Sequence, residues 1–242
     1  MNRFWHLINT TIGRKLIVAS SGIVLVLFLL GHMMGNLTIY LGADALNNYA
    51  HWLQSSPALW LIRAIMLAVV LVHIILAIRV TRENQAARTC RYQHCEGRWL
   101  RLYRKRMIIS GVVVLIFVIG HILHLTAGAG IEQLFRLLDA RGHADVYNRV
   151  VGSFQSPWLA WSYVFAMLFV SVHLKHSVRA LFQTLGFFHE NFFGFFELLS
   201  WVITIMVCAG LISIPLAVQF NLLQPDLATW SGSLADRTGV AT

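Results

Sequence analysis

Five long stretches of apolar residues, separated by short polar segments, dominate the hydropathy pattern of this chain. A helix needs about 20 consecutive apolar residues to cross the hydrocarbon core of a bilayer. The pattern predicts such helices at Leu16–Leu41, Pro57–Ile78, Met107–Gly128, Trp158–Ala180 and Phe195–Phe220. Helix is the expected conformation because lipid offers no partner for an unpaired backbone group. We therefore expect an all-α integral membrane domain of five transmembrane helices over residues 1–220 and a C-terminal tail over residues 221–242.

Charged residues are sparse and unevenly placed. Hydrophobic residues make up 57% of the chain and charged residues 12%, with a mean hydropathy of +0.67, whereas a soluble domain carries far more charge. The segment between the second and third stretches holds nine of the 19 Lys and Arg residues: Arg79, Arg82, Arg88, Arg91, Arg98, Arg101, Arg104, Lys105 and Arg106. Because cytoplasmic loops carry the excess of Lys and Arg, we expect the N-terminus in the cytoplasm and the C-terminus outside. The net charge of +9 therefore reflects membrane topology and does not indicate nucleic-acid binding.

The cysteines and the sequence motifs exclude several kinds of chemistry. The three cysteines, Cys90, Cys95 and Cys208, cannot ligate the several iron–sulfur clusters that a redox enzyme of this type needs. Cys90 and Cys95 bracket His94, which is a weak metal signal, and we interpret them as structural. The chain has no glycine-rich phosphate loop and no dinucleotide fingerprint. We therefore expect no catalytic residues here and assign the bond-breaking chemistry to a partner.

Six of the eleven histidines lie inside the apolar stretches: His32, His73, His121, His124, His173 and His176. An ionisable group inside a membrane helix is costly, which makes it a functional candidate. A single such histidine is more simply explained by a hydrogen bond between helices. Four helices that each carry one or two indicate a shared role, and neutral imidazole is a common axial ligand of haem iron.

The heights of these histidines in their helices form two layers. With a rise of about 1.5 Å per residue, His32 and His121 lie about 25 Å and about 22 Å from the cytoplasmic end of their helices. His73 and His173 each lie only about 9 Å from that end. Two axial ligands of one haem must come from different helices at matching depth. The pattern predicts an outer haem between His32 and His121. It predicts an inner haem between His73 and His173.

Other side chains in the spans support this arrangement. Gly35, Ala77, Gly128 and Ser177 share helix faces with the histidines and are small enough for a planar group to approach. Small residues are also common wherever membrane helices pack. Arg63 lies inside the second stretch, where an unpaired cation is costly. We expect Arg63 either to bind a haem propionate or a quinone oxygen, or to extend to the outer interface.

Several short motifs follow one another on successive predicted helices. They are His32-Met-Met-Gly-Asn36, Gly42-Ala-Asp-Ala-Leu-Asn47, His73 with the Arg-rich stretch after it, Ile116-Phe-Val-Ile-Gly-His121, and His173-Leu-Lys-His-Ser177 continuing to Phe182-Gln-Thr-Leu-Gly186. In this order and spacing the chain resembles, from Phe4 to Phe220, the cytochrome b anchor subunit of succinate:quinone oxidoreductases, the complex II group that includes fumarate reductases. The likeness is to the branch with one five-helix subunit and two b haems. It implies that His121 rather than His124, and His173 rather than His176, ligate iron.

The resemblance also implies a function. A flavoprotein subunit would interconvert succinate and fumarate, an iron–sulfur subunit would bring electrons to the membrane, and this chain would anchor both. The implied cofactors are two b haems, and the implied substrate is a membrane quinone, usually menaquinone in dihaem members. The chain would lie in the cell membrane of a prokaryote, within a complex that can form higher oligomers. By itself it would not act on succinate.

Quinone reduction needs protons as well as electrons, so a quinone site requires side chains that carry protons. Asp44, His51 and Gln54 precede the second predicted helix at the outer surface and are candidates for this role. Asp44 could instead cap a short surface helix, and His51 could simply be solvated. Two further classes fit parts of the pattern: a b-haem anchor of another quinone-linked dehydrogenase, and a haem-free transporter. A transporter is disfavoured because the chain lacks matching Gly- or Pro-interrupted spans in its two halves.

Overall fold

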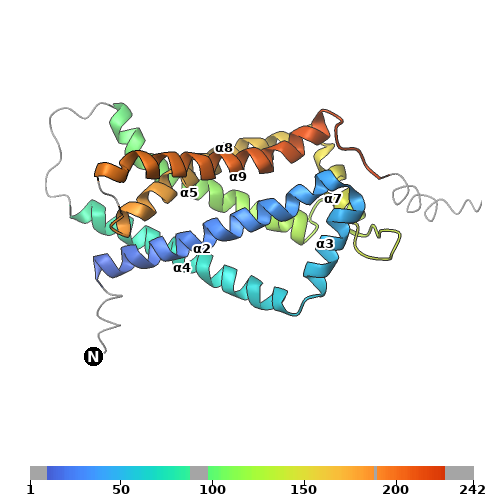
Figure 1. The fold of residues 1–242 in the computed structure, drawn as a ribbon, viewed down its shortest axis with the longest axis horizontal. Helices are drawn as coiled ribbons and strands as arrows, with labels where there is room; N and C mark the ends of the chain where they lie inside the picture. The colour runs from blue at the N-terminus through green and yellow to red at the C-terminus, as the bar shows by residue number, and fades with distance from the viewer. Residues whose placement is uncertain (1–9, 88–97, 188–189, 227–242) are drawn as a thin grey trace, which may run out of the picture. The chain divides into compact units, whose positions relative to one another are not determined.

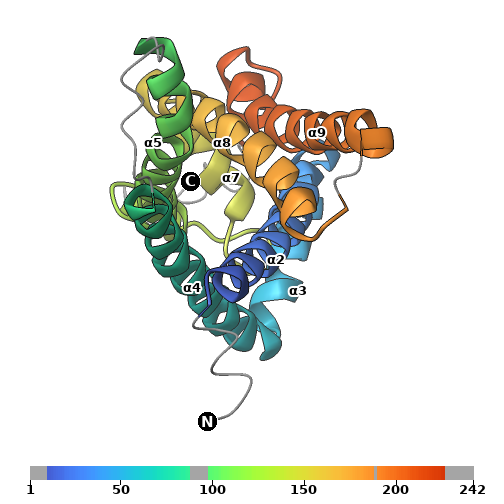
Figure 2. The same cartoon turned by 90° about the vertical axis from the view of Figure 1, so that its left-hand side faces the viewer.

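The computed structural model describes residues 10–87, 98–187 and 190–226, and these residues are mostly helical. Five helices are long and apolar enough to cross a membrane: α2 (Thr11–Leu37), which the 3-10 turn η1 (Thr38–Leu41) continues, α4 (Ala58–Ala86), α5 (Arg98–His121), α8 (Pro157–Thr184) and α9 (Phe193–Gln219). Figure 1 and Figure 2 label all five. The prediction of an all-α membrane protein with five spans is confirmed.

The first two membrane helices each extend further than predicted at one end. α2 begins at Thr11 rather than Leu16, and α4 continues to Ala86 rather than ending at Ile78. Hydropathy marks only the part of a helix that lies in hydrocarbon, whereas the backbone hydrogen bonds continue into the polar interface. An ion pair of 3.0 Å between Arg14 and Glu83 joins these two extensions.

The described residues form two compact units. The first comprises residues 10–30, 60–87, 98–110, 171–187 and 190–205. The second comprises residues 31–59, 111–170 and 206–226. Each of the five long helices therefore contributes residues to both units.

The second unit also contains short helices: α3 (Ala43–Ser55), α6 (Glu132–Phe135) and α7 (Val146–Phe154). The hydropathy pattern did not predict α6 and α7, whereas the π-helical turn η2 (Ile122–Thr126) continues α5 within the predicted third span. α7 packs against both α3 and α6. Val151 of α7 is fully buried, in an apolar core with Ile39, Leu46 and Ile214. Short amphipathic helices escape a search for long apolar stretches because only one of their faces is apolar.

The chain after α9 folds back onto α7. The Tyr147 hydroxyl donates to the backbone carbonyl of Gln224 at 3.0 Å. The Asn148 side chain donates to the backbone carbonyl of Asp226 at 3.1 Å and accepts from its N–H at 2.8 Å. The described part of the predicted C-terminal tail is thus held by hydrogen bonds, and residues 227–242 lie outside the described part. The cytoplasmic and outer placement of the termini stays a prediction.

The surfaces of the long helices are apolar. No residue of α4 is buried, although its span has a mean hydropathy of 2.8. Large side chains such as Leu61, Leu67 and Ile75 are half exposed or more along this helix. Exposed apolar area of this extent would be unfavourable in water and is favourable in lipid. This pattern supports membrane insertion independently of helix length.

Candidate functional site

The two predicted histidine pairs fall into different units of the structure. His73 of α4 and His173 of α8 belong to the first unit. His32 of α2 and His121 of α5 belong to the second. Each predicted pair therefore lies within one compact unit, the first together with His176 and the second together with His124.

In the first unit, a serine of α2 fixes the imidazole of His73. The Ser21 hydroxyl donates to the Val18 carbonyl at 3.0 Å, within its own helix. Its oxygen lies 3.0 Å from Nδ1 of His73. Because the hydroxyl proton is already used, the Ser21 oxygen acts as acceptor and Nδ1 of His73 carries the proton. That tautomer leaves the lone pair on Nε2.

His173 has the same environment, built from α5. The Ser110 hydroxyl donates to the Met107 carbonyl at 3.1 Å, and its oxygen lies 3.3 Å from Nδ1 of His173. His173 and His73 are close enough to interact electrostatically. A metal-ligating histidine almost always donates its other ring N–H to an acceptor, which fixes its tautomer and orientation. Both histidines of this pair meet that requirement.

Sequence reasoning missed Ser21 and Ser110, although a repeated pattern marks them. α2 contains Ser21-Gly22, eight residues and then Gly31-His32, and α5 contains Ser110-Gly111, eight residues and then Gly120-His121. Eleven residues are close to three helical turns, so in each helix the serine and the histidine share one face. Each of the two helices thus carries one predicted iron ligand. Its serine also contacts another predicted ligand, on α4 for Ser21 and on α8 for Ser110.

In the second unit, His32 and His121 face one another. Their ring centres are 5.8 Å apart and their planes are nearly perpendicular, at 87°. Two imidazoles that bind one metal at about 2.0 Å each would have ring centres about 6 Å apart. The Asn36 amide nitrogen lies 3.3 Å from Nε2 of His32 and donates to the His32 backbone carbonyl at 2.7 Å. The spacing of the two rings suits the binding of one metal between them.

The surroundings of His121 are aromatic. The rings of Phe117 and Tyr163 each lie 5.8 Å from its ring centre. The Tyr163 hydroxyl is 2.8 Å from Nδ1 of His124. Nδ1 of His121 is buried and has no hydrogen-bond partner among the described residues. The second pair therefore lacks, at His121, the serine acceptor that both histidines of the first pair have.

These observations test whether the histidines fit two haems. Haem iron with two axial imidazoles needs neutral rings, opposed in pairs and unprotonated at the ligating nitrogen. His73 and His173 have Nδ1 contacts that leave Nε2 unprotonated. These two residues fit the group, and for His32 and His121 the distance between the rings is compatible with it.

Three glycines of the long helices and their connections have close side-chain neighbours. A Cβ atom on Gly35 would lie 2.5 Å from the Tyr49 hydroxyl, so the Tyr49 side chain already fills this space. At Gly128 the neighbouring group is the Phe135 ring. Gly22, which directly follows Ser21, is the glycine that borders a histidine, since its Cβ position lies 3.7 Å from Cε1 of His73. Gly35 and Gly128 therefore allow the side chains of Tyr49 and Phe135 to pack closely, and their approach to a planar group stays a prediction.

Arg63 lies against an aromatic ring. Its guanidinium is 4.9 Å from the centre of the Trp60 ring, one turn earlier on α4. Both side chains are exposed. This contact fits an arginine that extends towards an interface with an aromatic neighbour, which was one of the two expectations.

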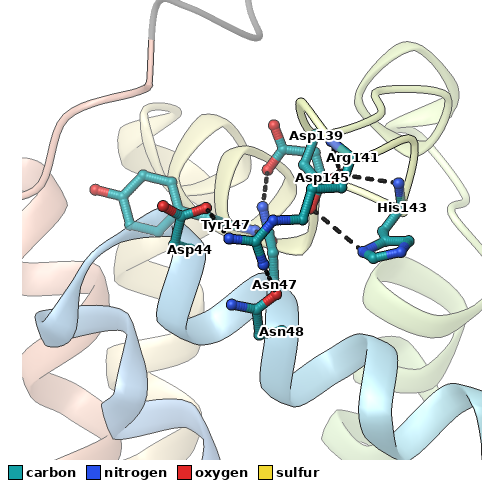
Figure 3. A network of polar contacts seen from close by, with 8 residues as sticks. All are labelled: Asp44, Asn47, Asn48, Asp139, Arg141, His143, Asp145 and Tyr147. Carbon is teal, nitrogen blue, oxygen red and sulfur yellow. Dashed lines mark hydrogen bonds and ion pairs between the residues drawn. The ribbon is translucent and has the colours of Figure 1, made fainter.

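The predicted quinone residues lie on α3, and Asp44 belongs to a polar network with the loop before α7 (Figure 3). The Asp44 carboxylate is 3.8 Å from the Arg141 guanidinium, which also donates to the Asn48 side chain. The His51 ring stacks on His143, with 3.6 Å between ring centres and an angle of 9°. Gln54 is exposed. The network connects α3 to this loop, and a role for Asp44, His51 and Gln54 in binding quinone stays a prediction.

Asp145 is the buried centre of the same region. Its carboxylate accepts from the Asn47 side chain at 3.1 Å, and from the Asn148 backbone and side chain at 3.0 Å and 2.8 Å. It also caps the N-terminus of α7. The predicted Cys90, His94 and Cys95 group lies outside the described residues.

No protein-family model, curated protein or solved structure matches this chain. The resemblance to the complex II cytochromes therefore rests on the short motifs alone. The inference about what the site can bind rests on the distances and contacts of the histidines.

Proposed function

We propose that this chain is the membrane-anchor cytochrome b subunit of a succinate:quinone oxidoreductase, either a succinate dehydrogenase or a fumarate reductase. The single observation that carries the proposal is the matched pair of Ser–His contacts, Ser21 with His73 and Ser110 with His173. A histidine that serves only as a hydrogen bond between helices needs no second histidine in an equivalent setting. Two equivalent tautomers in one unit are what a pair of axial ligands requires.

In this proposal, Nε2 of His73 and His173 would hold one b haem, and Nε2 of His32 and His121 would hold the other. When bound, the haems would supply reversible one-electron transfer, because an iron with two protein ligands has no open position for oxygen chemistry. The serines hold the protons on Nδ1 and keep the imidazoles from rotating. The aromatic rings of Phe117 and Tyr163 would pack beside the haem of the second pair.

The partners follow from the same proposal. A cytoplasmic flavoprotein subunit would act on succinate or fumarate, and an iron–sulfur subunit would pass electrons to or from this chain. The final acceptor or donor would be a membrane quinone, with menaquinone proposed. The complex would lie in the cell membrane of a prokaryote, and this chain alone would not turn over succinate.

The first test is the ratio of haem to polypeptide in the detergent-purified chain, together with its reduced-minus-oxidised spectrum. We expect two b haems per chain with low-spin spectra typical of two histidine ligands. A well-folded preparation without haem would reject the proposal. The succinate:quinone reductase activity of the purified complex separates it from a b-haem anchor of another dehydrogenase, which would contain haem but lack that activity.

A further inference from the structure

An open pocket of about 690 Å³ lies in the second unit, between α6 and the start of α8. Its lining includes Glu132, Gln133, Leu134, Trp158, Leu159 and Ser162. Pockets for small organic ligands and cofactors commonly measure about 300–1,000 Å³. The pocket is therefore large enough for an aromatic two-ring head and the first part of an apolar tail.

The pocket lies where two membrane spans end. The span formed by α5 and η2 ends at Thr126, and the span of α8 begins at Pro157. Trp158, in the first turn of that span, is 89% exposed, and it lines the pocket together with Leu159. Aromatic side chains favour the interface between lipid and water. A ligand with a lipid-soluble tail could thus reach this pocket from the bilayer.

The polar side chains of the pocket offer both donors and acceptors. The Gln133 amide and the Ser156 hydroxyl make no hydrogen bond to other described residues, so both can donate to a ligand carbonyl. The backbone N–H groups of Glu132 itself and of Gly130 lower the pKa of the Glu132 carboxyl. Glu132 is therefore an acceptor at neutral pH. Two donors and one acceptor match a quinone, whose carbonyl oxygens become hydroxyl groups on reduction.

The same turn of α8 also borders the second histidine pair. Ser162 lines the pocket, and the next residue is Tyr163. The Tyr163 ring lies 5.8 Å from the His121 ring, and its hydroxyl is 2.8 Å from Nδ1 of His124. The pocket and the proposed iron ligand are thus joined through one side chain.

The geometry points to this pocket as the binding site of the membrane quinone, with Gln133 and Ser156 as donors to its carbonyl oxygens. This inference rests on the proposed function. Reduction adds two electrons and two protons to the quinone and forms two O–H bonds. The electrons come from succinate through the partner subunits, and the protons come from water at the open mouth of the pocket. The reaction runs in reverse when fumarate is reduced.

The pocket differs from the site that the sequence predicted. Asp44, His51 and Gln54 all lie on α3, and none of them lines it. Photolabelling of the intact complex in its own membranes, with an azido-naphthoquinone as probe, decides between the two places. We expect the labelled peptides to contain residues 130–134 or 156–162. Labelling confined to residues 43–55, or the absence of specific labelling in a complex with both haems, would overturn the inference.

Two substitutions test the pocket by kinetics. Leu159→Trp fills it, and Gln133→Leu removes one donor from an exposed position where a folding defect is not expected. We expect the KM of the complex for a short-chain naphthoquinone to rise roughly tenfold in each, as for a lost hydrogen bond or lost space. Ile119→Trp, at an exposed position of α5 outside the pocket, is the matched control and should leave this KM unchanged. Unchanged KM values in both pocket variants would overturn the inference.

The outcomes also separate this inference from the proposed function. Haem content and the rate of succinate oxidation with a soluble dye are measured on the unmodified complex. If both are absent, the proposed function fails whatever the label shows. If both are present, but the label does not reach the pocket or the KM values of the pocket variants do not change, only the assignment of the quinone to this pocket fails.

Discussion

The Ser21 oxygen lies 3.0 Å from Nδ1 of His73, although the two residues are 52 positions apart in the sequence. The hydroxyl proton of Ser21 is directed to the Val18 carbonyl of its own helix. The imidazole must therefore donate from Nδ1, and its Nε2 is left with a lone pair. A serine in a helix usually satisfies its hydroxyl locally. Here that local bond also determines which ring nitrogen of His73, on another helix, carries the proton.

We predict that Ser21→Ala and Ser110→Ala raise the potential of the haem in the first unit. Without the acceptor the imidazole is less basic and stabilises ferric iron less well. One hydrogen bond of about 0.5–1.5 kcal/mol limits the shift to on the order of 20–60 mV. Redox titration of the haem absorbance measures it. Ser200→Ala is the control, because Ser200 donates to the Glu197 carbonyl at 2.7 Å in the same unit, so an equal shift there would contradict the prediction.

Substitution of a histidine in one unit should remove only the haem of that unit. His73→Ala or His173→Ala is expected to lower the content from two haems to one per chain, because His32 and His121 belong to the other unit. The pyridine haemochrome assay on purified protein gives the ratio. Loss of both haems at a normal level of folded protein would show that the two pairs are not independent.

Gly35→Ala should destabilise the protein by about 1–3 kcal/mol, as overpacking generally does. The added methyl group would meet the Tyr49 ring at 2.5–2.7 Å, and Tyr49 belongs to α3. Gly31→Ala is the matched control in the same helix, with no atom within 4 Å of the new Cβ. It should be neutral or stabilising by up to about 1 kcal/mol, because alanine favours helix. Thermal unfolding in detergent measures both changes, and equal midpoints would refute this account of Gly35.

Asp145→Ala should cost about 2–4 kcal/mol of unfolding free energy. It removes a helix cap and leaves the buried Asn47 and Asn148 donors without their acceptor. Asp44→Ala is the control, since the Asp44 side chain is 86% exposed and its ion pair with Arg141 measures 3.8 Å. Such a surface pair contributes about 0–1 kcal/mol. Denaturant unfolding of the two variants should therefore differ clearly, and similar midpoints would argue against a structural role for Asp145.

Stability should fall at alkaline pH through Tyr147. Burial, followed by the charges of Asp226 and Asp145, raises the pKa of the Tyr147 hydroxyl in the folded protein. A raised folded pKa gives stability that is complete below the unfolded value of about 10 and is lost as pH rises towards the folded value. Tyr147→Phe should remove this dependence at the cost of one hydrogen bond, that to the Gln224 carbonyl. Thermal midpoints measured from pH 9 upwards test it, and parallel profiles for the two proteins would contradict it.

The sequence by itself determined the five membrane helices and the placement of the histidines on them. Both depend on local properties: a long apolar stretch in lipid must be helical, and residue number fixes height along a helix. The pairing of His73 with His173 and of His32 with His121 followed from height alone, and each pair does lie within one unit. The two-haem interpretation and the family resemblance stay predictions.

Only the tertiary structure decided which side chains meet between elements. Height along a helix does not fix its rotation, so the partners of Ser21 and Ser110 could not be read from one helix at a time. The contact between Gly35 and Tyr49 could not be predicted because Tyr49 lies on another helix and is not visible in the local pattern. The short helix α7 and the pocket beside it arise from segments that are neither long nor uniformly apolar. Hydropathy determines which segments enter the membrane, whereas contacts between distant segments determine what they can bind.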